Sequence, residues 1–468
     1  MRSEAKFEMR WIMPLYDRLG VGSVQRTVFL VIAVAMIAAG WGRLAVTGSL
    51  MTDDAVVYFA QVRSMVLDRD ADLTNEVARL ASDVSAFTGR PKINATGVMD
   101  LFSPTAGHHV SWYAYGTAAL FAPFFLIGHM IALAAHALGF DVDIDGYGRL
   151  QQFGCLLGSA FYAAAGAVLL RRLIEFYFDR SVAFLASSAM LVATPIPFYV
   201  SFHPLMAHVP SFFLVTAFLL QWRRTLGERS LRDWALLGAL AGLIPVVRYE
   251  QSILWIVMAY DLVVFVRAVA GPRRTASAAW AGAAAFLAPF AAIVAPQLYL
   301  NAAHFGGPFR TGYDDINTGG ALYEEGIVAR ALSPDFGWIL FSPYGGFATW
   351  TPILGIAAVG LVAAAMRSSA APIRLMALGL FLQIYFLAMW GSAGDSFGSR
   401  YLVGSLAPFG LGLAWIVDRA ARSEAGRVAA TAGCVLFAVG NGLAMAAYTL
   451  TRYVPQGRWP NWLLSAMS

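Results

Sequence analysis

Twelve apolar stretches, each close to the length of a membrane span, constrain this chain more than any other feature. Inside a bilayer every backbone polar group must be satisfied within the protein, and a helix satisfies its own. The sequence therefore predicts an all-α, polytopic membrane helix bundle of about 11–12 spans. The stretches lie near residues 27–47, 112–138, 150–170, 181–199, 205–222, 231–247, 250–266, 276–299, 338–365, 375–390, 402–417 and 427–449.

The composition agrees with a membrane protein. Of the 468 residues, 59% are hydrophobic and 13% are charged, whereas soluble proteins carry about 25% charged residues. The net charge of +5 suits basic cytoplasmic turns and gives no reason to expect nucleic acid as a partner. Both cysteines, Cys155 and Cys434, lie inside apolar runs, so we expect them to pack rather than to form a disulfide or bind metal.

Lysine and arginine predict the orientation, because cytoplasmic loops of membrane proteins are enriched in them. Residues 1–26 and five later turns hold 20 of the 33 basic residues, and we place these segments in the cytoplasm. The first apolar stretch is then an uncleaved span rather than a signal peptide. With this sidedness, 112–138 must begin and end outside, as a re-entrant or juxtamembrane hairpin that bends at Pro123 and Gly128. The alternative is twelve full spans.

The predicted organisation has four parts. They are a cytoplasmic N-terminus (1–26), an N-terminal transmembrane module (27–300) that includes a long external loop (48–111), a second external loop (301–335), and C-terminal transmembrane helices (336–468).

Two juxtamembrane amphipathic helices are predicted in the first external loop. The first begins at Asp54 and carries Tyr58 and Val62 on its apolar face. The second carries Val77 and Leu80, with Glu76 and Arg79 on the opposite, polar face. Such helices lie in the plane of the membrane interface.

Ionisable residues gather on the predicted outer face. Arg248 and Glu250, for example, interrupt an otherwise apolar stretch. Ionisable groups at membrane depth are costly and usually face a functional cavity; the alternative is that Arg248 and Glu250 only neutralise each other. The outer-face candidates are Asp53, Asp54, His108, His109, His203, His208, Arg248, Glu250, Arg310, Asp314, Asp315, Asp395 and Arg400.

Metal and nucleotide motifs are weak. The acidic stretches 68–76 and 141–152 begin like calcium loops but lack the final bidentate carboxylate, and the histidines have no zinc-binding spacing. We expect no cofactor, and a divalent metal stays an open alternative.

The stretch 53-DDAVVYFAQVR-63, followed by 68-DRDADLTNE-76, resembles the GT-C integral-membrane glycosyltransferases, in the branch of the protein O-mannosyltransferases and lipid A aminoarabinose transferases. Members of that branch have an acidic pair after the first span, then a tyrosine and an arginine, which match Tyr58 and Arg63. On this alignment Asp54 is the catalytic aspartate and Asp53 its neighbour. The acidic pair is shifted by one residue from the family's Asp-Glu, so either aspartate is a candidate base, and Asp53 is also suited to cap the helix. The softer similarities include 112-WYAYGTAALFAPFFLIG-128, 296-PQLYLNAAHFGGPFRTGY-313 and 394-GDSFGSRYL-402.

The resemblance implies an inverting glycosyltransferase that uses a polyprenyl-phosphate sugar donor at the periplasmic face of the bacterial cytoplasmic membrane. Its acceptor is an envelope glycan, lipid or protein, and Tyr58 and Arg63 join the substrate-binding candidates. The leaving lipid phosphate needs cationic donors, for which Arg248, Arg310 and Arg400 are candidates. Asp314 and Asp315 either contact sugar hydroxyls or lie in a solvated loop.

Two other functions use similar features. A glycan polymerase or ligase of the O-antigen type also has outward-facing arginines, but it lacks an acidic pair after the first span. A transporter or flippase for lipid-linked glycans is expected to have pseudo-symmetric halves, which this sequence does not show.

Overall fold

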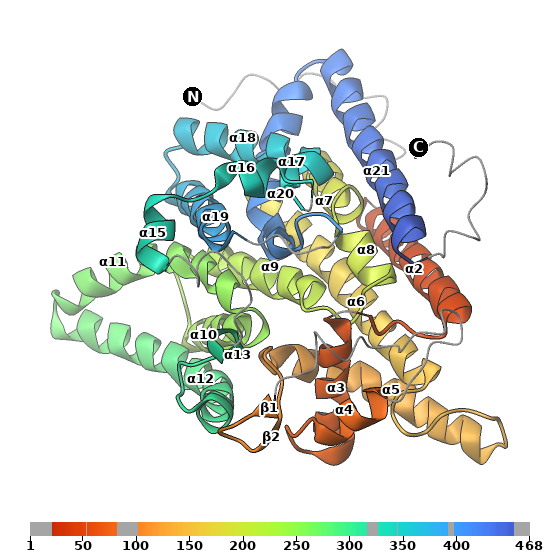
Figure 1. Ribbon diagram of the computed structural model, residues 1–468. Helices are drawn as coiled ribbons and strands as arrows, with labels where there is room; N and C mark the ends of the chain where they lie inside the picture. Colours follow the sequence, from red (N-terminus) through yellow and green to blue (C-terminus); the bar gives the residue numbers. More distant parts are fainter. Residues whose placement is uncertain are drawn as a thin grey trace.

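The protein is a bundle of helices with one short hairpin of strands (Figure 1). The structure, a computed structural model, describes residues 21–52, 54–81, 102–315, 326–343, 345–391 and 397–453. The strands β1 (Phe102–Ser103) and β2 (His108–His109) pair antiparallel, with Phe102 opposite His109.

The N-terminal half begins with a long helix and continues into the first external loop. Its helices are α2 (Val21–Thr47), α3 (Ala55–Arg63), the π-helical turn η1 (Ser64–Asp68), α4 (Thr74–Ala81), α5 (Gly116–Ala137), α6 (Arg149–Ile174), α7 (Arg180–Val192), α8 (Ile196–Ser201), α9 (His208–Arg224) and α10 (Leu231–Val247).

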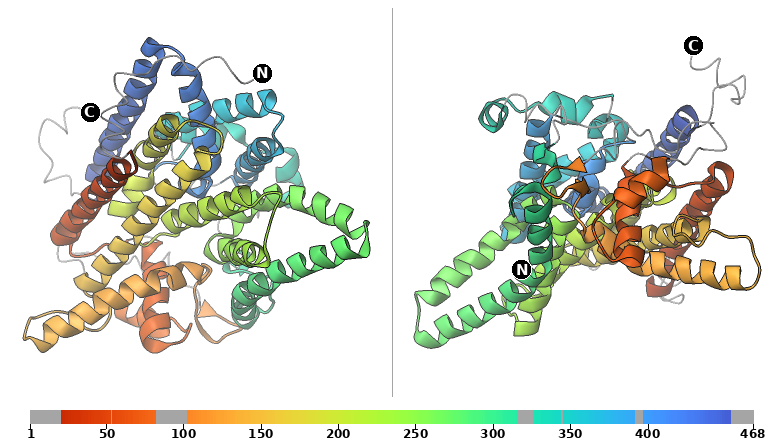
Figure 2. Two further views of the ribbon diagram at one scale, coloured as in Figure 1. Left: turned by 180° about the vertical axis from the view of Figure 1, so that it is seen from behind. Right: turned by 60° about the horizontal axis from the view of Figure 1, so that its bottom comes forward.

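In the second half, α11 and α12 form a hairpin that projects from the body in every view (Figures 1 and 2). The helices are η2 (Tyr249–Met258), α11 (Ala259–Val269), α12 (Arg273–Phe305), α13 (Gly312–Asp315), α15 (Ile327–Leu332), α16 (Phe336–Phe341), α17 (Phe347–Trp350), α18 (Pro352–Arg367), α19 (Ala371–Trp390), η3 (Arg400–Ser405), α20 (Leu406–Ala420) and α21 (Glu424–Tyr453).

The prediction of a polytopic helical membrane protein is confirmed. Eight helical segments among the described residues are long and apolar enough to cross a membrane, and they coincide with eight of the twelve predicted stretches. The other four stretches form shorter helices. Residues 181–199 divide into α7 and α8, 338–365 divides into α16, α17 and α18, and α9 and α10 have 17 residues each.

The predicted hairpin at 112–138 is wrong. Residues 116–137 form one continuous 22-residue helix, α5, with Pro123 inside it. A proline removes one backbone hydrogen bond but does not by itself reverse a helix, and the middle of α5 packs against the first turns of α6. There Gly154 allows the approach, since a Cβ at this position would lie 2.3 Å from the Phe124 carbonyl oxygen.

Close helix crossings at glycine also hold the C-terminal half together. A Cβ on Gly412 of α20 would lie 1.9 Å from the Ala357 carbonyl oxygen of α18, and one on Gly360 would lie 2.2 Å from the Gly412 carbonyl oxygen. Lipid tails are as apolar as the helices, so membrane helices associate largely through such close van der Waals packing. This crossing supports α20, whose preceding turn carries Arg400.

The first external loop is ordered around Arg63. Its guanidinium forms ion pairs with Asp68 and, at 2.7 Å, with Glu76, and its Nε donates to the Asp145 carbonyl oxygen at 3.0 Å. Glu76 is fully buried, so its predicted place on a polar outer face is wrong: helix α4 turns this carboxylate inward, onto Arg63. Residues 82–101, which include the rest of the predicted second helix, lie outside the described residues.

We predict that Gly412→Ala lowers the thermal stability of the protein in detergent. The added methyl group meets backbone atoms of α18 that cannot move aside, and overpacking of this kind costs about 1–3 kcal/mol. Gly433→Ala in α21 is the matched control, because a Cβ there meets nothing within 4 Å; both changes gain the same helix propensity. Equal melting temperatures for the two variants would contradict this account of the crossing.

We predict that Glu76 makes stability depend on pH. Burial raises the pKa of its carboxyl to about 7, against the lowering effect of the Arg63 hydrogen bond. Between pH 4.5, its ordinary value, and about 7, the folded protein therefore holds a proton that the unfolded chain has lost. The contribution of the Glu76 carboxyl to the free energy of unfolding is therefore fully present below pH 4.5 and is lost as the pH rises towards 7. Melting curves from pH 5 to 8 should show this fall in the native protein and a smaller one in Glu76→Gln; equal slopes would exclude it.

Candidate functional site

Two adjoining cavities lie where the ends of several helices meet. One, of about 140 Å³, is lined by polar and charged groups, including Asp54, His208 and Arg400. The other, of about 200 Å³, is lined mainly by apolar and aromatic groups, including Val247, Phe386 and Leu387. We call them the polar cavity and the apolar cavity. Both are lined by Tyr58, Tyr113, Arg248, Tyr313, Trp390 and Tyr401.

An ion pair in the polar cavity joins the first external loop to the C-terminal half. Asp54 stands immediately before α3, and its Oδ2 accepts a hydrogen bond from Arg400 Nη1 at 2.8 Å. The two side chains are 23% and 16% exposed, so the pair is only partly screened by water. Charge-assisted contacts of this kind are stronger than neutral hydrogen bonds.

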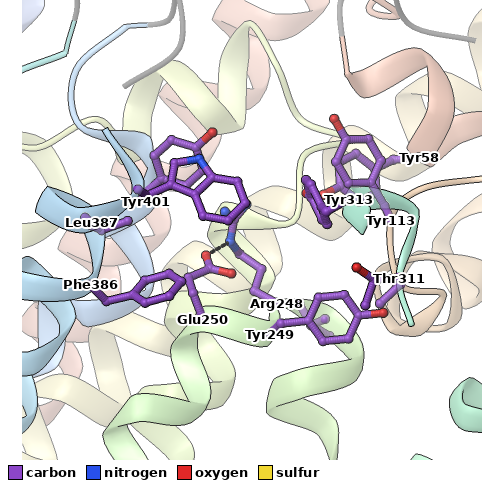
Figure 3. A pocket seen from close by; sticks show the side chains of 13 residues that line it. Tyr58, Tyr113, Arg248, Tyr249, Glu250, Thr311, Tyr313, Phe386, Leu387 and Tyr401 are labelled. Carbon is purple, nitrogen blue, oxygen red and sulfur yellow. Dashed lines mark hydrogen bonds and ion pairs between the residues drawn. The ribbon is translucent and has the colours of Figure 1, made fainter. Parts of the chain in front are cut away.

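Arg248 lies between the two cavities. It follows α10 in an extended conformation (φ −151°, ψ 111°) and precedes η2. Its Nε forms an ion pair with Glu250, and its Nη1 donates to His208 Nδ1 at 3.1 Å. Figure 3 shows the Arg248–Glu250 pair, with Phe386 and Leu387 on one side and Tyr58, Tyr113 and Tyr313 on the other. The Arg248 guanidinium also lies 5.2 Å from the centre of the Tyr401 ring.

Aromatic rings form one continuous wall of the site. Tyr58 stacks on Tyr113 with ring centroids 4.4 Å apart. Tyr113 meets Tyr313 edge to face at 6.3 Å, and Tyr313 meets Trp390 at 5.9 Å. Burial raises the pKa of Tyr58, Tyr113 and Tyr313, so these phenols stay neutral and can donate hydrogen bonds.

Three buried N–H groups of the polar cavity find no hydrogen-bond partner among the described residues. They are Arg400 Nε, His208 Nε2 and Trp112 Nε1. An arginine can only donate, so His208 Nδ1 accepts from Arg248, and the proton of the neutral imidazole is on Nε2. Buried donors without partners are costly, and an anionic oxygen is the kind of group that accepts most strongly from them.

Gln251 supports the Arg400 side of the site from η2. It is fully buried; its Nε2 donates to the Tyr401 carbonyl oxygen at 3.0 Å, and its Oε1 accepts from Ser405 Oγ at 3.2 Å. These bonds fix the turn that carries Arg400 and Tyr401.

The structure brings six of the predicted site residues to the two cavities: Asp54, Tyr58, His208, Arg248, Glu250 and Arg400. Six others line neither cavity: Arg63, His108, His109, His203, Arg310 and Asp314. Arg63 instead forms ion pairs with Asp68 and Glu76 inside the first external loop. The Nδ1 of His108 lies 3.5 Å from Asp72 Oδ1, and the His203 ring packs on Phe198 with ring centroids 5.1 Å apart. Asp53, Asp395 and the side chain of Asp315 lie outside the described part of the chain.

Apart from Tyr58, the sequence prediction missed the aromatic residues of the site. Trp112 and Tyr113 open the quoted stretch 112–128, Tyr313 closes 296–313, and Tyr401 follows Arg400. Each therefore lies inside or beside a segment that had been singled out. Tyr313 and Tyr401 are next to Asp314 and Arg400, and this adjacency to a charged residue was the available signal for those two; Trp112 and Tyr113 have no such signal.

The described residues include no group of three or more His, Cys, Asp or Glu side chains placed to hold a metal ion. The close partner of Asp54 is a guanidinium, and no metal or cofactor site is assigned.

We predict that Arg400→Gln destabilises the protein because it leaves the partly buried Asp54 carboxylate without its cation. Losing a hydrogen bond to a charged group costs about 2 kcal/mol. Adding Asp54→Asn should recover part of that loss, since the remaining amide carries no charge. Melting temperatures of the two single variants and the double variant form the cycle; strictly additive effects would show that the pair is not coupled.

Comparisons with known proteins give a clear result only at the level of the fold. No family model matches the chain, and no curated protein does. The fold is similar to the oligosaccharyltransferase of Archaeoglobus fulgidus in its apo form, with 14% identity and a TM-score of 0.52 over 92% of this chain. The same enzyme, AglB, in complex with an inhibitory peptide and a dolichol-phosphate, gives 13% identity and 0.54 over 96%.

ArnT from Cupriavidus metallidurans, bound to undecaprenyl phosphate, is similar with 12% identity and a TM-score of 0.55 over 95% of this chain. The chain spans 58–59% of the length of the two archaeal structures and 68% of ArnT. At the level of the fold these matches agree with the resemblance of the first loop: the chain is a multi-pass helical membrane protein whose fold is similar to those of AglB and ArnT.

Proposed function

We propose that this protein is a membrane glycosyltransferase that moves a sugar from a polyprenyl-phosphate donor to an acceptor hydroxyl. The observation that carries the proposal is the polar cavity, where one carboxylate, Asp54, lies with two arginines and unpartnered N–H donors. The fold also supports a polyprenyl-phosphate donor, because proteins with a similar fold have been solved in complex with dolichol-phosphate or undecaprenyl phosphate.

Asp54 is the proposed general base. The acceptor hydroxyl must lose its proton as it attacks the anomeric carbon, and a carboxylate within hydrogen-bond reach accepts it. Attack from the face opposite the phosphate inverts the anomeric centre. The neutral phenols of Tyr58, Tyr113 and Tyr313 are suited to donate to sugar oxygens.

Arg248 and Arg400 are the proposed phosphate-binding residues. The leaving phosphate gains negative charge as its bond to the sugar breaks, and preorganised cationic donors stabilise that charge most where water is excluded. The apolar cavity adjoins both groups through Tyr58, Tyr113 and Tyr401. Its lining by Val247, Phe386 and Leu387 suits the first isoprene units of the lipid.

We place the reaction at the periplasmic face of a bacterial cytoplasmic membrane. His208 begins α9 at the cavity, whereas Arg223 and Arg224 lie in the last turn of the same helix. The positive-inside tendency puts that basic end in the cytoplasm and the cavity outside. The acceptor is then a glycan, lipid or protein of the cell envelope.

The alternatives are a glycan polymerase or ligase and a flippase. A transferase accounts for a base beside the phosphate-binding arginines, whereas a flippase has no use for the base.

We predict that Asp54→Asn reduces sugar transfer by at least about 100-fold, the lower end of what a general base contributes. The protein is reconstituted in vesicles with an undecaprenyl-phosphate sugar fraction and a cell-envelope extract as the source of acceptor hydroxyls, and released undecaprenyl phosphate is measured by mass spectrometry. Asp54→Asn should still bind the intact donor. Asp145→Asn is the control, because Asp145 forms an ion pair with Arg79 at 3.1 Å on the surface of the protein. This variant should transfer sugar at the native rate. Transfer by Asp54→Asn at the native rate would refute the assignment of the base.

A further inference from the structure

Arg400 has one partner whose charge the proposed reaction removes. Its Nη1 holds Asp54 at 2.8 Å, and its guanidinium carbon lies 5.2 Å from the centre of the Tyr401 ring. Its Nη2 donates to the Tyr401 hydroxyl at 3.4 Å, and its Nε is buried and has no hydrogen-bond partner among the described residues. The carboxylate of Asp54 therefore occupies Nη1, while Nε donates to no acceptor among the described residues.

Arg248 is bound differently. It forms an ion pair with Glu250 and donates to His208 Nδ1, and neither partner changes its charge in the proposed reaction. Glu250 lines only the apolar cavity, away from Asp54. In the resting site, each of these two arginines is neutralised by its own carboxylate, so the four side chains carry no net charge.

We propose, on the basis of the proposed function, that Arg400 is a cation shared between the base and the leaving group: it passes from Asp54 to the lipid phosphate during the reaction. The inference names Arg400 as a catalytic residue that couples proton uptake to phosphate departure. Arg248 keeps its contacts throughout.

The step balances in atoms and charge. The acceptor oxygen forms a bond to the anomeric carbon, and its proton passes to Asp54. The bond from the anomeric carbon to the phosphate oxygen breaks, and its electron pair stays on that oxygen. Asp54 thereby loses one negative charge and the lipid phosphate gains one, as a diester monoanion becomes a monoester dianion. Arg400 is released at the moment when the phosphate needs a further cation.

The unpartnered donors around Arg400 support the same place for the phosphate. His208 and Trp112 line the polar cavity with Arg400, and each carries a buried N–H, His208 Nε2 and Trp112 Nε1, that has no hydrogen-bond partner among the described residues. Together with a freed Nη1 they offer N–H groups of the kind that anionic oxygens accept from most strongly. In the resting protein the Asp54 carboxylate competes with the phosphate for Arg400.

The competition can be measured by binding alone, without knowing the sugar. Asp54→Asn imitates the protonated base, so it should bind undecaprenyl phosphate more tightly than the native protein does. We expect a gain of about 5-fold or more, the usual lower size of a coupling between two sites. The gain should disappear when Arg400→Gln is present in both members of the pair, and Arg400→Lys should retain part of it.

The experiment measures the Kd of purified, full-length protein for undecaprenyl phosphate in lipid nanodiscs. Undecaprenol, which has no phosphate, is the matched ligand and should bind all variants equally. Asp145→Asn and Arg79→Gln form the matched control pair outside both cavities and should change neither Kd. Melting temperatures confirm that each variant is folded.

The outcomes separate the two proposals. An unchanged or weaker affinity in Asp54→Asn, or a gain that persists without Arg400, would overturn the shared cation and leave the proposed function in place. If neither the native protein nor Asp54→Asn bound undecaprenyl phosphate, the donor class itself, and with it the proposed function, would be wrong.

Discussion

The contact between Asp54 and Arg400 is the interaction on which the site depends. It joins residues 346 positions apart, one in the first external loop and the other in η3, the turn before α20. A carboxylate and a guanidinium in a partly dry cavity are each costly alone. Together they hold the two halves of the protein in a fixed relation around the cavities, and they place a base next to a phosphate-binding cation.

The helix packing around this pair explains why the contact forms. Glycine crossings, such as those of Gly360 with Gly412 and of Gly154 with α5, let backbones approach closely. The helix ends then converge, and the polar turns that follow or precede them meet at one place. Buried Gln251 joins η2 to the turn that carries Arg400 and Tyr401, so the position of the cation does not depend on the ion pair alone.

Much of the fold could be predicted from the sequence, because apolar runs of span length report directly on membrane helices. The exceptions have physical causes. The distribution of lysine and arginine between the turns favoured a hairpin at 112–138, because both ends of this segment were expected outside. In the structure, helical hydrogen bonding continues past Pro123. Glu76 was expected on a polar face, yet it is buried against Arg63, because periodicity does not reveal which way α4 turns. The substrate-binding role of Arg63 that the family pattern implies stays a prediction.

The charged residues of the candidate site could be singled out from the sequence, whereas Tyr58 is the one residue of its aromatic wall that was. Asp54, Arg248 and Arg400 stand out because charge at membrane depth is costly. Tyr113, Tyr313 and Trp390 do not, because aromatic residues near span ends are common in membrane proteins. Their convergence into one wall depends on which helix ends meet, and this is a property of the tertiary structure.

The decisive measurement is a structure of the protein bound to undecaprenyl phosphate in a lipid nanodisc. We expect the phosphate in the polar cavity, within hydrogen-bond distance of Arg400, with the lipid tail leaving through the apolar cavity. A phosphate bound elsewhere on the protein, with the polar cavity closed to it, would show that this cavity is not the donor site.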